Sequence, residues 1–145
     1  MNEESRSFAC LMASECLAVR VRRLGRVITR LYDAALTPHG VTIAQLNLLT
    51  AIAAAGGARL TDLGRILDVE KSTLSRDLKR MQQLGWIRFA PTGSRRRRSI
   101  SLTPAGARLL LEVRPAWEKA QETARSQLGR GAFAGLRKLL PPIGG

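Results

Sequence analysis

The chain has 145 residues, which suits one ordinary domain and is too short for two full ones. Hydrophobic residues make up 45% of it, enough for a core, and the formal net charge of +13 points to a polyanionic partner. Charge alone does not separate duplex DNA from RNA or a membrane surface, but no apolar run approaches the roughly 20 residues that span a bilayer.

The N-terminal part predicts one long amphipathic helix, from about Phe8 to Leu36. Its apolar residues recur every three or four positions: Leu17, Val21, Leu24, Ile28, Leu31 and Ala35. Arginines lie on or near the opposite side, and Pro38 and Gly40 end the helix. A long terminal helix often packs against another chain. The acidic residues near the start do not fit a signal peptide, so we expect a cytoplasmic protein with no membrane contact.

Two shorter helices are predicted next. The first begins at a capping box formed by Thr42 and Gln45, and it ends at Gly56 and Gly57. The second lies in the segment LTDLGRILDV. We expect Thr61 to cap its N-terminus. We expect its apolar residues to face the core: Leu63, Ile66 and Leu67.

The following helix, about Lys71 to Leu84, has the features of a helix that reads DNA. Leu74, Leu78, Met81 and Leu84 form its predicted inward side. Hydroxyl groups and an arginine near its N-terminus suit the base edges of a major groove. We expect base contacts from Ser72, Thr73, Ser75 and Arg76, and phosphate contacts from Lys71 and Lys79. A solvated polar face is the alternative for one isolated helix.

The next segment predicts two strands, Trp86–Ala90 and Ser99–Leu102, around a basic turn. The turn carries Arg95, Arg96, Arg97 and Arg98 in a row. These side chains repel one another unless an anion is present, and a narrow minor groove attracts arginine. We expect one or two of them to enter a minor groove and the others to bind phosphates. The alternative is a basic loop that binds any polyanion.

The C-terminal part predicts further helices. Thr103 and Pro104 form an N-cap followed by proline at the first helical position. Pro115 lies within the helix that follows and should bend it or break one of its hydrogen bonds. A last helix is predicted from about Ala132 to Leu140.

In its order of elements the chain resembles the MarR family of bacterial transcription regulators, over roughly Cys16 to Leu140. The most specific pieces are STLSRDLKRMQQLGWI, which begins at Ser72, and LTPAG, which begins at Leu102. In members of the family, the wing usually carries an acidic residue, then any residue, then an arginine, before the Leu-Thr pair that is Leu102 and Thr103 here. Here those places fall on Ser94 and Arg96, so the acid is missing.

The resemblance implies a mainly α winged helix-turn-helix protein with one domain over residues 1–145. Residues 8–37 and 104–140 would form the dimerisation helices of a homodimer, and residues 42–103 the DNA-binding lobe. Two such lobes would bind successive major grooves of a roughly palindromic double-stranded operator. Such a dimer usually acts as a repressor that a ligand or an oxidant releases.

Two kinds of sensor fit this family. Members that sense organic hydroperoxides keep a reactive cysteine in the first helix near tyrosines, but Cys16 falls about two residues too early and a second tyrosine is missing. Cys10 is the other thiol. The alternative is a pocket for a small aromatic or phenolic ligand. Its candidate residues are Arg20, Arg23, Tyr32, His39 and Trp117, each of which also has an ordinary structural explanation.

Other classes of function fit less well. His39 is the only histidine and there are two cysteines, so we expect no metal site, no cofactor and no histidine-dependent catalysis. No phosphate-binding glycine loop or nucleophile motif indicates an enzyme. A non-specific architectural nucleic-acid-binding protein remains the alternative. A dimeric module without a nucleic-acid role would not explain ten basic residues and one acid between Lys71 and Arg108.

Overall fold

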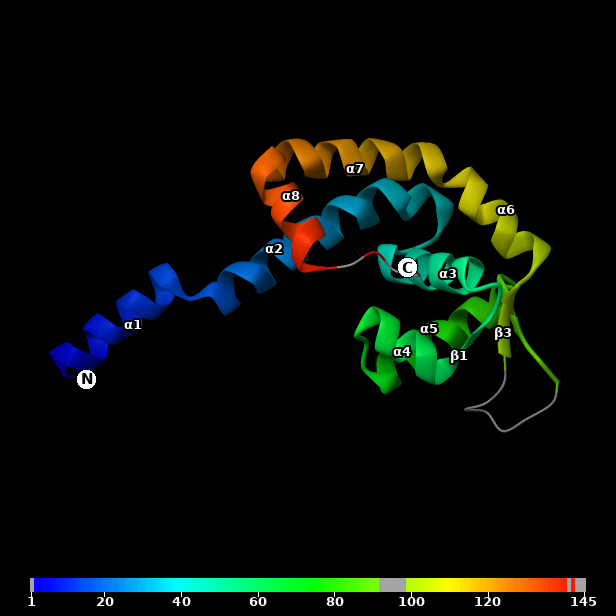
Figure 1. Ribbon diagram of the computed structural model, residues 1–145, viewed down its shortest axis with the longest axis horizontal. Helices are drawn as coiled ribbons and strands as arrows, with labels where there is room; N and C mark the ends of the chain where they lie inside the picture. Colours follow the sequence, from blue (N-terminus) through cyan, green and yellow to red (C-terminus); the bar gives the residue numbers. More distant parts are fainter. Residues whose placement is uncertain (1, 92–98, 141, 143–145) are drawn as a thin grey trace.

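The structure, a computed structural model, describes residues 2–91, 99–140 and 142 of the chain. It is mainly helical with one small sheet, which confirms the predicted fold class (Figure 1). The elements in chain order are α1 (Glu3–Glu15), α2 (Leu17–Leu36), η1 (Thr37–His39), α3 (Ile43–Ala54), β1 (Ala58–Arg59), α4 (Leu60–Leu67), α5 (Lys71–Gln83), β2 (Ile87–Phe89), β3 (Ser99–Leu102), α6 (Pro104–Glu112), α7 (Arg114–Leu128) and α8 (Arg130–Leu139). None of the helices in these described ranges has the length and apolar character needed to cross a membrane.

Helices pack on both sides of α2. On one side α7 runs along α2, and α8 turns back beside them; on the other side lie α3, α4 and α5, with the sheet at their end (Figure 1). The larger core belongs to this second group and includes Leu49, Met81 and Ile100, all fully buried. A smaller cluster, which includes Tyr32 and Ala124, joins α2 to α7. The chain therefore has a lobe formed by α3 to β3 and a separate layer of terminal helices.

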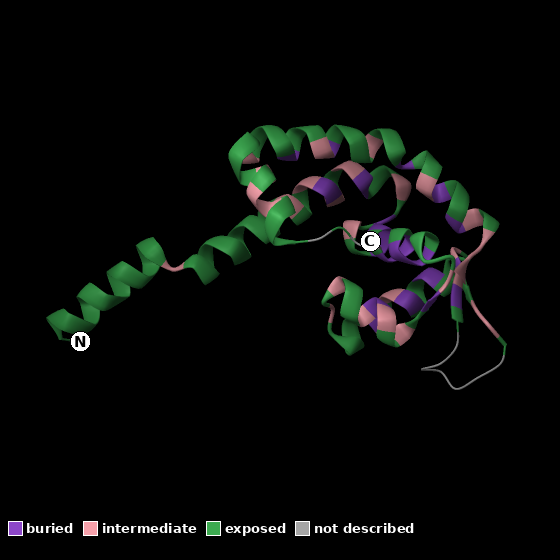
Figure 2. Ribbon diagram, viewed as in Figure 1, coloured by how far each residue is buried: buried purple, intermediate pink, exposed green. Residues whose placement is uncertain are grey.

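The single helix predicted from about Phe8 to Leu36 is in fact two helices, because Cys16 takes an extended conformation with ψ 111°. Every residue of α1 is exposed, so no packing holds α1 in line with α2. The Arg20 guanidinium donates to the carbonyl oxygen of Ser14, which satisfies one of the acceptors near the break. As a result α1 projects from the body as an exposed arm (Figure 2).

The start of α3 is as predicted and the start of α4 is not. Thr42 Oγ1 accepts a hydrogen bond from the Gln45 amide, and Gln45 Oε1 accepts one from the Thr42 amide, both at 3.2 Å. In α4, however, Arg59 occupies the N-cap position and makes no side-chain capping bond, so Thr61 is not the cap. Arg59 belongs to β1, and strand pairing already gives it the extended conformation that an N-cap needs.

Two residues predicted to face the core, Ile66 and Leu84, are instead 39% and 38% exposed. In α4 the buried line runs through Leu63 and the half-buried Leu67, one turn apart, and Ile66 lies beside it. Leu84 is the C-cap of α5, and Gly85 reverses the chain with φ 74°, so Leu84 leaves the buried side of the helix.

The sheet has three strands where two were predicted. Its order is β1-β3-β2, and both pairings are antiparallel. Strands β2 and β3 match the predicted wing strands, with Phe89 opposite Ile100. Strand β1 is two residues long, too short for an alternating pattern, and it forms because Ala58 pairs with Ile100 from the other edge.

The predicted restart at Thr103 is confirmed, since its Oγ1 accepts a hydrogen bond of 3.1 Å from the Gly106 amide. The helix predicted to bend or to lose one hydrogen bond at Pro115 is in fact two helices, because the chain divides into α6 and α7 at Val113. Pro115 lies in the first turn of α7, where its missing N–H removes no helical hydrogen bond.

Candidate nucleic-acid interface

The exposed side of α5 is the candidate interface. Leu74, Leu78 and Met81 are at most 1% exposed and fix the side that faces the core. Ser75 is half-buried, whereas the other residues predicted to contact DNA from this helix are exposed: Lys71, Ser72, Thr73, Arg76 and Lys79. The predicted outward orientation is therefore found for these five residues, and contact with DNA stays a prediction.

Four polar residues form a line along α5, which we call the α5 outer stripe: Ser72, Arg76, Lys79 and Gln83. Their spacing of four, three and four residues places them on one side of the helix, opposite Leu78. Gln83 was missed in the sequence, although the same periodicity extends to it. Arginine pairs with guanine and glutamine with adenine, so Arg76 and Gln83 have the chemistry to read base edges, and Lys79 between them suits a phosphate.

The only acidic residue of α5, Asp77, lies next to the stripe. Burial raises the pKa of the Asp77 carboxyl, and the charge of Arg76 opposes that shift. A carboxylate at this place lowers the net positive charge of the exposed side of α5.

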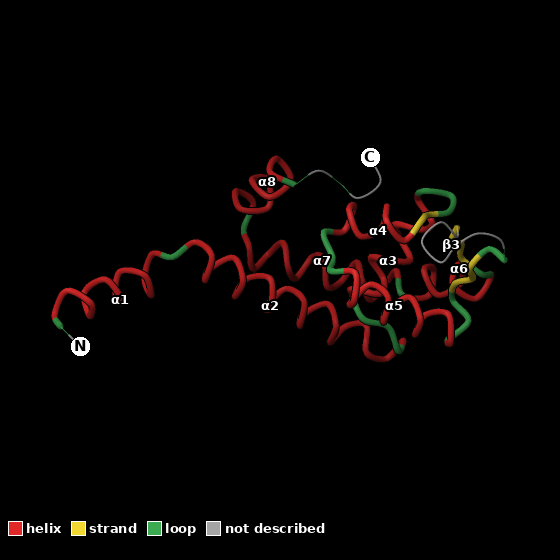
Figure 3. The backbone as a smooth tube through the Cα atoms, turned by 90° about the horizontal axis from the view of Figure 1, so that it is seen from below, coloured by secondary structure: helices red, strands yellow, loops and turns green. Residues whose placement is uncertain are grey.

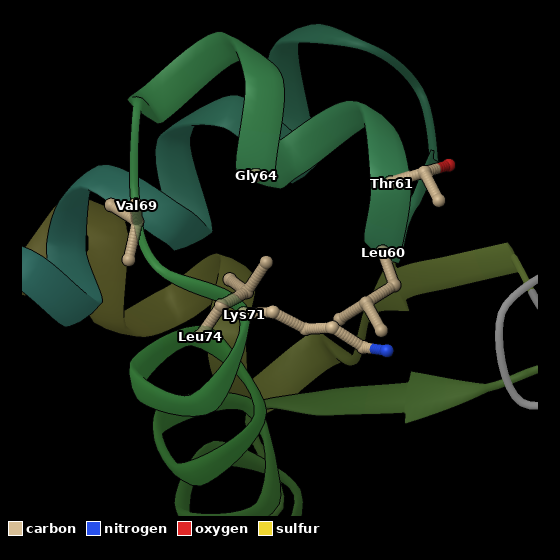
Figure 4. A pocket seen from close by; sticks show the side chains of 6 residues that line it. All are labelled: Leu60, Thr61, Gly64, Val69, Lys71 and Leu74. Carbon is tan, nitrogen blue, oxygen red and sulfur yellow. The ribbon is translucent and has the colours of Figure 1, made fainter.

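A cavity of about 330 Å³ lies between α4 and α5. Its lining residues are Leu60, Thr61, Gly64, Val69, Lys71 and Leu74. Lys71 reaches from the first turn of α5 towards Leu60, at the start of α4, and does not follow the outer stripe (Figure 4). The ammonium group is thus placed beside the first turns of both helices, a position that suits a phosphate contact and not a base contact.

Two exposed arginines lie at the base of the wing. Arg88 Nε donates to Ser101 Oγ across β2 and β3 at 3.1 Å, and Arg59 lies on the outer strand β1. Both were missed in the sequence: alternation along the strand could have identified Arg88, whereas Arg59 required the unpredicted third strand. The residues predicted to contact DNA from the turn, Arg95, Arg96, Arg97 and Arg98, lie outside the described residues.

The end of α5 is tied to the start of α6. The Thr103 amide donates to the Trp86 carbonyl oxygen at 3.0 Å, and Thr103 Oγ1 donates to the Gly85 carbonyl oxygen at 2.5 Å. Because α6 continues into α7, these bonds link the orientation of α5 and the wing to the layer of terminal helices.

The residues predicted to sense a ligand or an oxidant are spread over several elements. They are Cys10 in α1, Cys16 at the α1–α2 junction, Arg20, Arg23 and Tyr32 in α2, His39 in η1 and Trp117 in α7. Tyr32 and Trp117 line separate cavities, of about 330 and 240 Å³. The structure of one chain therefore does not bring these residues into one pocket.

The cavity at Tyr32 lies between α2, α7 and α8 and is mostly apolar. The Tyr32 hydroxyl donates to Gln121 Oε1. Burial raises the pKa of the Tyr32 phenol, and the charge of Arg125 opposes that shift. The Arg125 guanidinium lies over the ring of Phe133, 4.5 Å from its centre. Apolar walls with a few polar groups are suited to an aromatic or phenolic ligand.

Within residues 2–91, 99–140 and 142, no three side chains of histidine, cysteine, aspartate or glutamate come together as a metal site would require.

Four similarities, one to a family model and three to known proteins, bear on this geometry. The model of the MarR family matches residues 39–98. The multiple antibiotic resistance protein MarR of Salmonella typhimurium is 32% identical over 130 residues, which cover 83% of this chain and 90% of that protein. A mutant MarR from Escherichia coli complexed with operator DNA has a TM-score of 0.76 at 23% identity, and covers 90% of this chain and 94% of its own. The Mycobacterium tuberculosis regulator MosR in complex with DNA has a TM-score of 0.71 at 29% identity, with coverages of 86% and 96%.

Proposed function

Because this chain belongs to the MarR family, we propose that it is a transcription regulator that binds a double-stranded operator with sequence preference. The observation that supports this most is the α5 outer stripe, exposed beside the two-stranded base of a basic wing. A helix of this composition enters a major groove with its N-terminal residues against base edges. The proposed role of the protein is to bind DNA and not to catalyse a reaction. It would act in the cytoplasm, where the operator lies.

We infer that the active form is a homodimer. Large apolar side chains are exposed on the terminal helices, among them Phe8, Leu11, Leu17, Val21 and Leu139, with exposed fractions between 57% and 78%. Apolar residues in such number, on helices that the lobe does not cover, favour burial against a second copy. The dimerisation helices are those of residues 8–37 and 104–140. A two-fold axis then presents two α5 helices to a roughly palindromic site.

The regulator is proposed to repress transcription until a small ligand or an oxidant releases it. The cavity at Tyr32 is the better candidate for an aromatic or phenolic ligand, because it joins an apolar lining to a tyrosine and an arginine. Peroxide acting on Cys10 or Cys16 is the second candidate, because Cys10 is exposed and Cys16 half-buried, and access is one requirement for oxidation.

The decisive experiment measures binding of the purified protein to the DNA upstream of its own gene and to a random duplex, over a series of salt concentrations. A preference of about a thousandfold or more for one palindromic site is expected. The titration is repeated with peroxide, with reductant and with salicylate as an aromatic probe. Loss of binding in one of these conditions identifies the kind of signal.

The net charge of +13 favours one other function, that of an architectural protein that binds nucleic acid without sequence preference. Equal affinity for random duplexes and for the tightest sequences selected from a random pool would establish it and would reject the sequence-specific regulator.

A further inference from the structure

A second basic surface lies on α2, far from α5 in the sequence. This helix carries five arginines, Arg20, Arg22, Arg23, Arg26 and Arg30, all exposed. Three of them recur at intervals of four residues and line one shallow depression, whose floor includes Gly25 and Thr29. We call these three, Arg22, Arg26 and Arg30, the α2 arginine face. The backbone rises by about 6 Å along the helix axis from one of these arginines to the next.

The positive charge of this face is not neutralised within the described part of the chain. There, the only ion pair joins Arg114 to Glu118, on α7. The only acidic residue of α2, Asp33, accepts a hydrogen bond of 2.7 Å from the Ile43 amide, so it is engaged with α3. Like charges at one-turn spacing destabilise a helix unless an anion lies between them. The face therefore has the composition of an anion-binding surface.

The direction of the α2 arginine face follows from its neighbours. Tyr32 and Ile28 pack on the side of α2 that faces α7. Asp33 is three residues after Arg30, on the arginine side, and its bond to Ile43 shows that this side turns towards α3 and the DNA-binding lobe. In the view from below, the N-terminal half of α2 lies clear of α3, α4 and α5 (Figure 3). The arginines thus point to the same side of the molecule as the lobe.

We propose that the α2 arginine face binds the phosphates of operator DNA between the two half-sites that the α5 helices read. This inference rests on the proposed dimeric regulator. A two-fold axis among the terminal helices places the uncovered halves of both α2 helices between the two lobes, and half-sites one turn apart leave duplex beneath them. Arginine binds phosphate oxygens in pairs of hydrogen bonds, which adds affinity and salt dependence without sequence preference.

The test uses two full-length variants with the same change of charge. The first is Arg22→Gln/Arg26→Gln/Arg30→Gln. The control, Arg114→Gln/Lys119→Gln/Arg130→Gln, alters exposed residues of α7 and α8, on the other side of α2. Glutamine is as good a helix former as arginine, so both are expected to fold, which circular dichroism checks. Affinity for a duplex of about 30 base pairs, selected by the protein from a random pool, is measured over a salt series.

The logarithm of the binding constant falls as the logarithm of the salt concentration rises. Each lost phosphate contact reduces the steepness of this fall by about 0.9. We expect the α2 variant to lose about two or more from this slope and the control less than about one. Methylphosphonates that neutralise the central phosphates should lower the slope for the unaltered protein and change it little for the α2 variant, because the same contacts are already absent.

The outcomes separate this inference from the proposed function. If the unaltered protein selects no sequence, the proposed function fails. If it selects one and the α2 variant keeps the full slope, the inference fails and the regulator stands. A variant that instead dissociates into monomers in sedimentation would show that these arginines bind a second copy, with the acidic residues of its α1 as the partners, and would overturn the inference too.

Discussion

The backbone of Gly106, at the start of α6, lies against the carbonyl group of Trp86, so that a Cβ at position 106 would stand 2.1 Å from the Trp86 oxygen. The same oxygen accepts the hydrogen bond of the Thr103 amide. This contact joins the wing and the end of α5 to the helix that leads to the terminal layer, and it requires a residue without a side chain.

Gly106→Ala is therefore expected to lower the free energy of unfolding by about 2–4 kcal/mol, since backbone must move to admit the methyl group. The measurement is urea unfolding followed by circular dichroism. Gly64→Ala is the matched control, because a Cβ there meets only ordinary contacts, at 3.6 Å or more. A Gly106→Ala protein as stable as the control would show that α6 can shift freely.

Arg76→Ala is expected to weaken binding to the preferred operator by about 1–3 kcal/mol and to relax preference at one base position. Lys79→Ala serves as the comparison, because a phosphate contact weakens specific and random binding alike. Fluorescence anisotropy with both duplexes distinguishes the two. Equal losses on both duplexes for Arg76→Ala would assign that arginine to a phosphate.

Asp77→Asn is expected to stabilise the fold at about pH 7. Burial raises the pKa of the Asp77 carboxyl, so folding disfavours its charged form. The stabilising contribution of the neutral carboxyl is fully present below the ordinary pKa of 3.8 and is lost as pH rises through the folded-state pKa. The gain in melting temperature should therefore vanish at about pH 3, where both proteins are uncharged at this position. A gain that is the same at both pH values would contradict the desolvation argument. Glu122→Gln, at an exposed position of α7, is the control.

Tyr32→Phe is expected to cost about 1 kcal/mol, because the Oε1 atom of Gln121 loses the hydroxyl that donates to it. Gln121→Leu removes the other partner, and the double variant should lose less than the sum of the two single changes. Thermal unfolding of all four proteins gives this coupling energy. Additive losses would mean that the hydrogen bond contributes nothing to stability.

Thr42→Ala should cost about 1 kcal/mol through loss of the capping box at the start of α3. Thr50→Ala is the control, since the Thr50 hydroxyl only bonds back to the Leu46 carbonyl within the same helix and is not needed there. Chemical unfolding at one pH compares them. A larger effect at Thr50 would show that the cap is not what stabilises this helix.

Most of the elements and the exposed side of α5 could be predicted from the sequence. Helix caps and helix faces depend on residues three or four positions apart. The caps at Thr42 and Thr103 are of this kind, and so is the buried side of α5 with Leu74, Leu78 and Met81. Periodicity reports such contacts directly. Gln83 and Arg88 follow the same periodicities, of a helix and of a strand, and are therefore predictable from the sequence as well.

Other features were decided by tertiary structure, because they depend on residues far apart in the chain. Strand β1 exists through its pairing with Ile100, and that pairing moved the N-cap of α4 to Arg59. All residues of α1 are exposed, and the helix ends at Cys16 although no proline or glycine lies there. Local patterns specify which side of a helix is apolar, but only long-range packing decides what covers that side. For this reason the sequence does not give the direction of the arginines on α2, which follows from the hydrogen bond between Asp33 and the Ile43 amide at the start of α3.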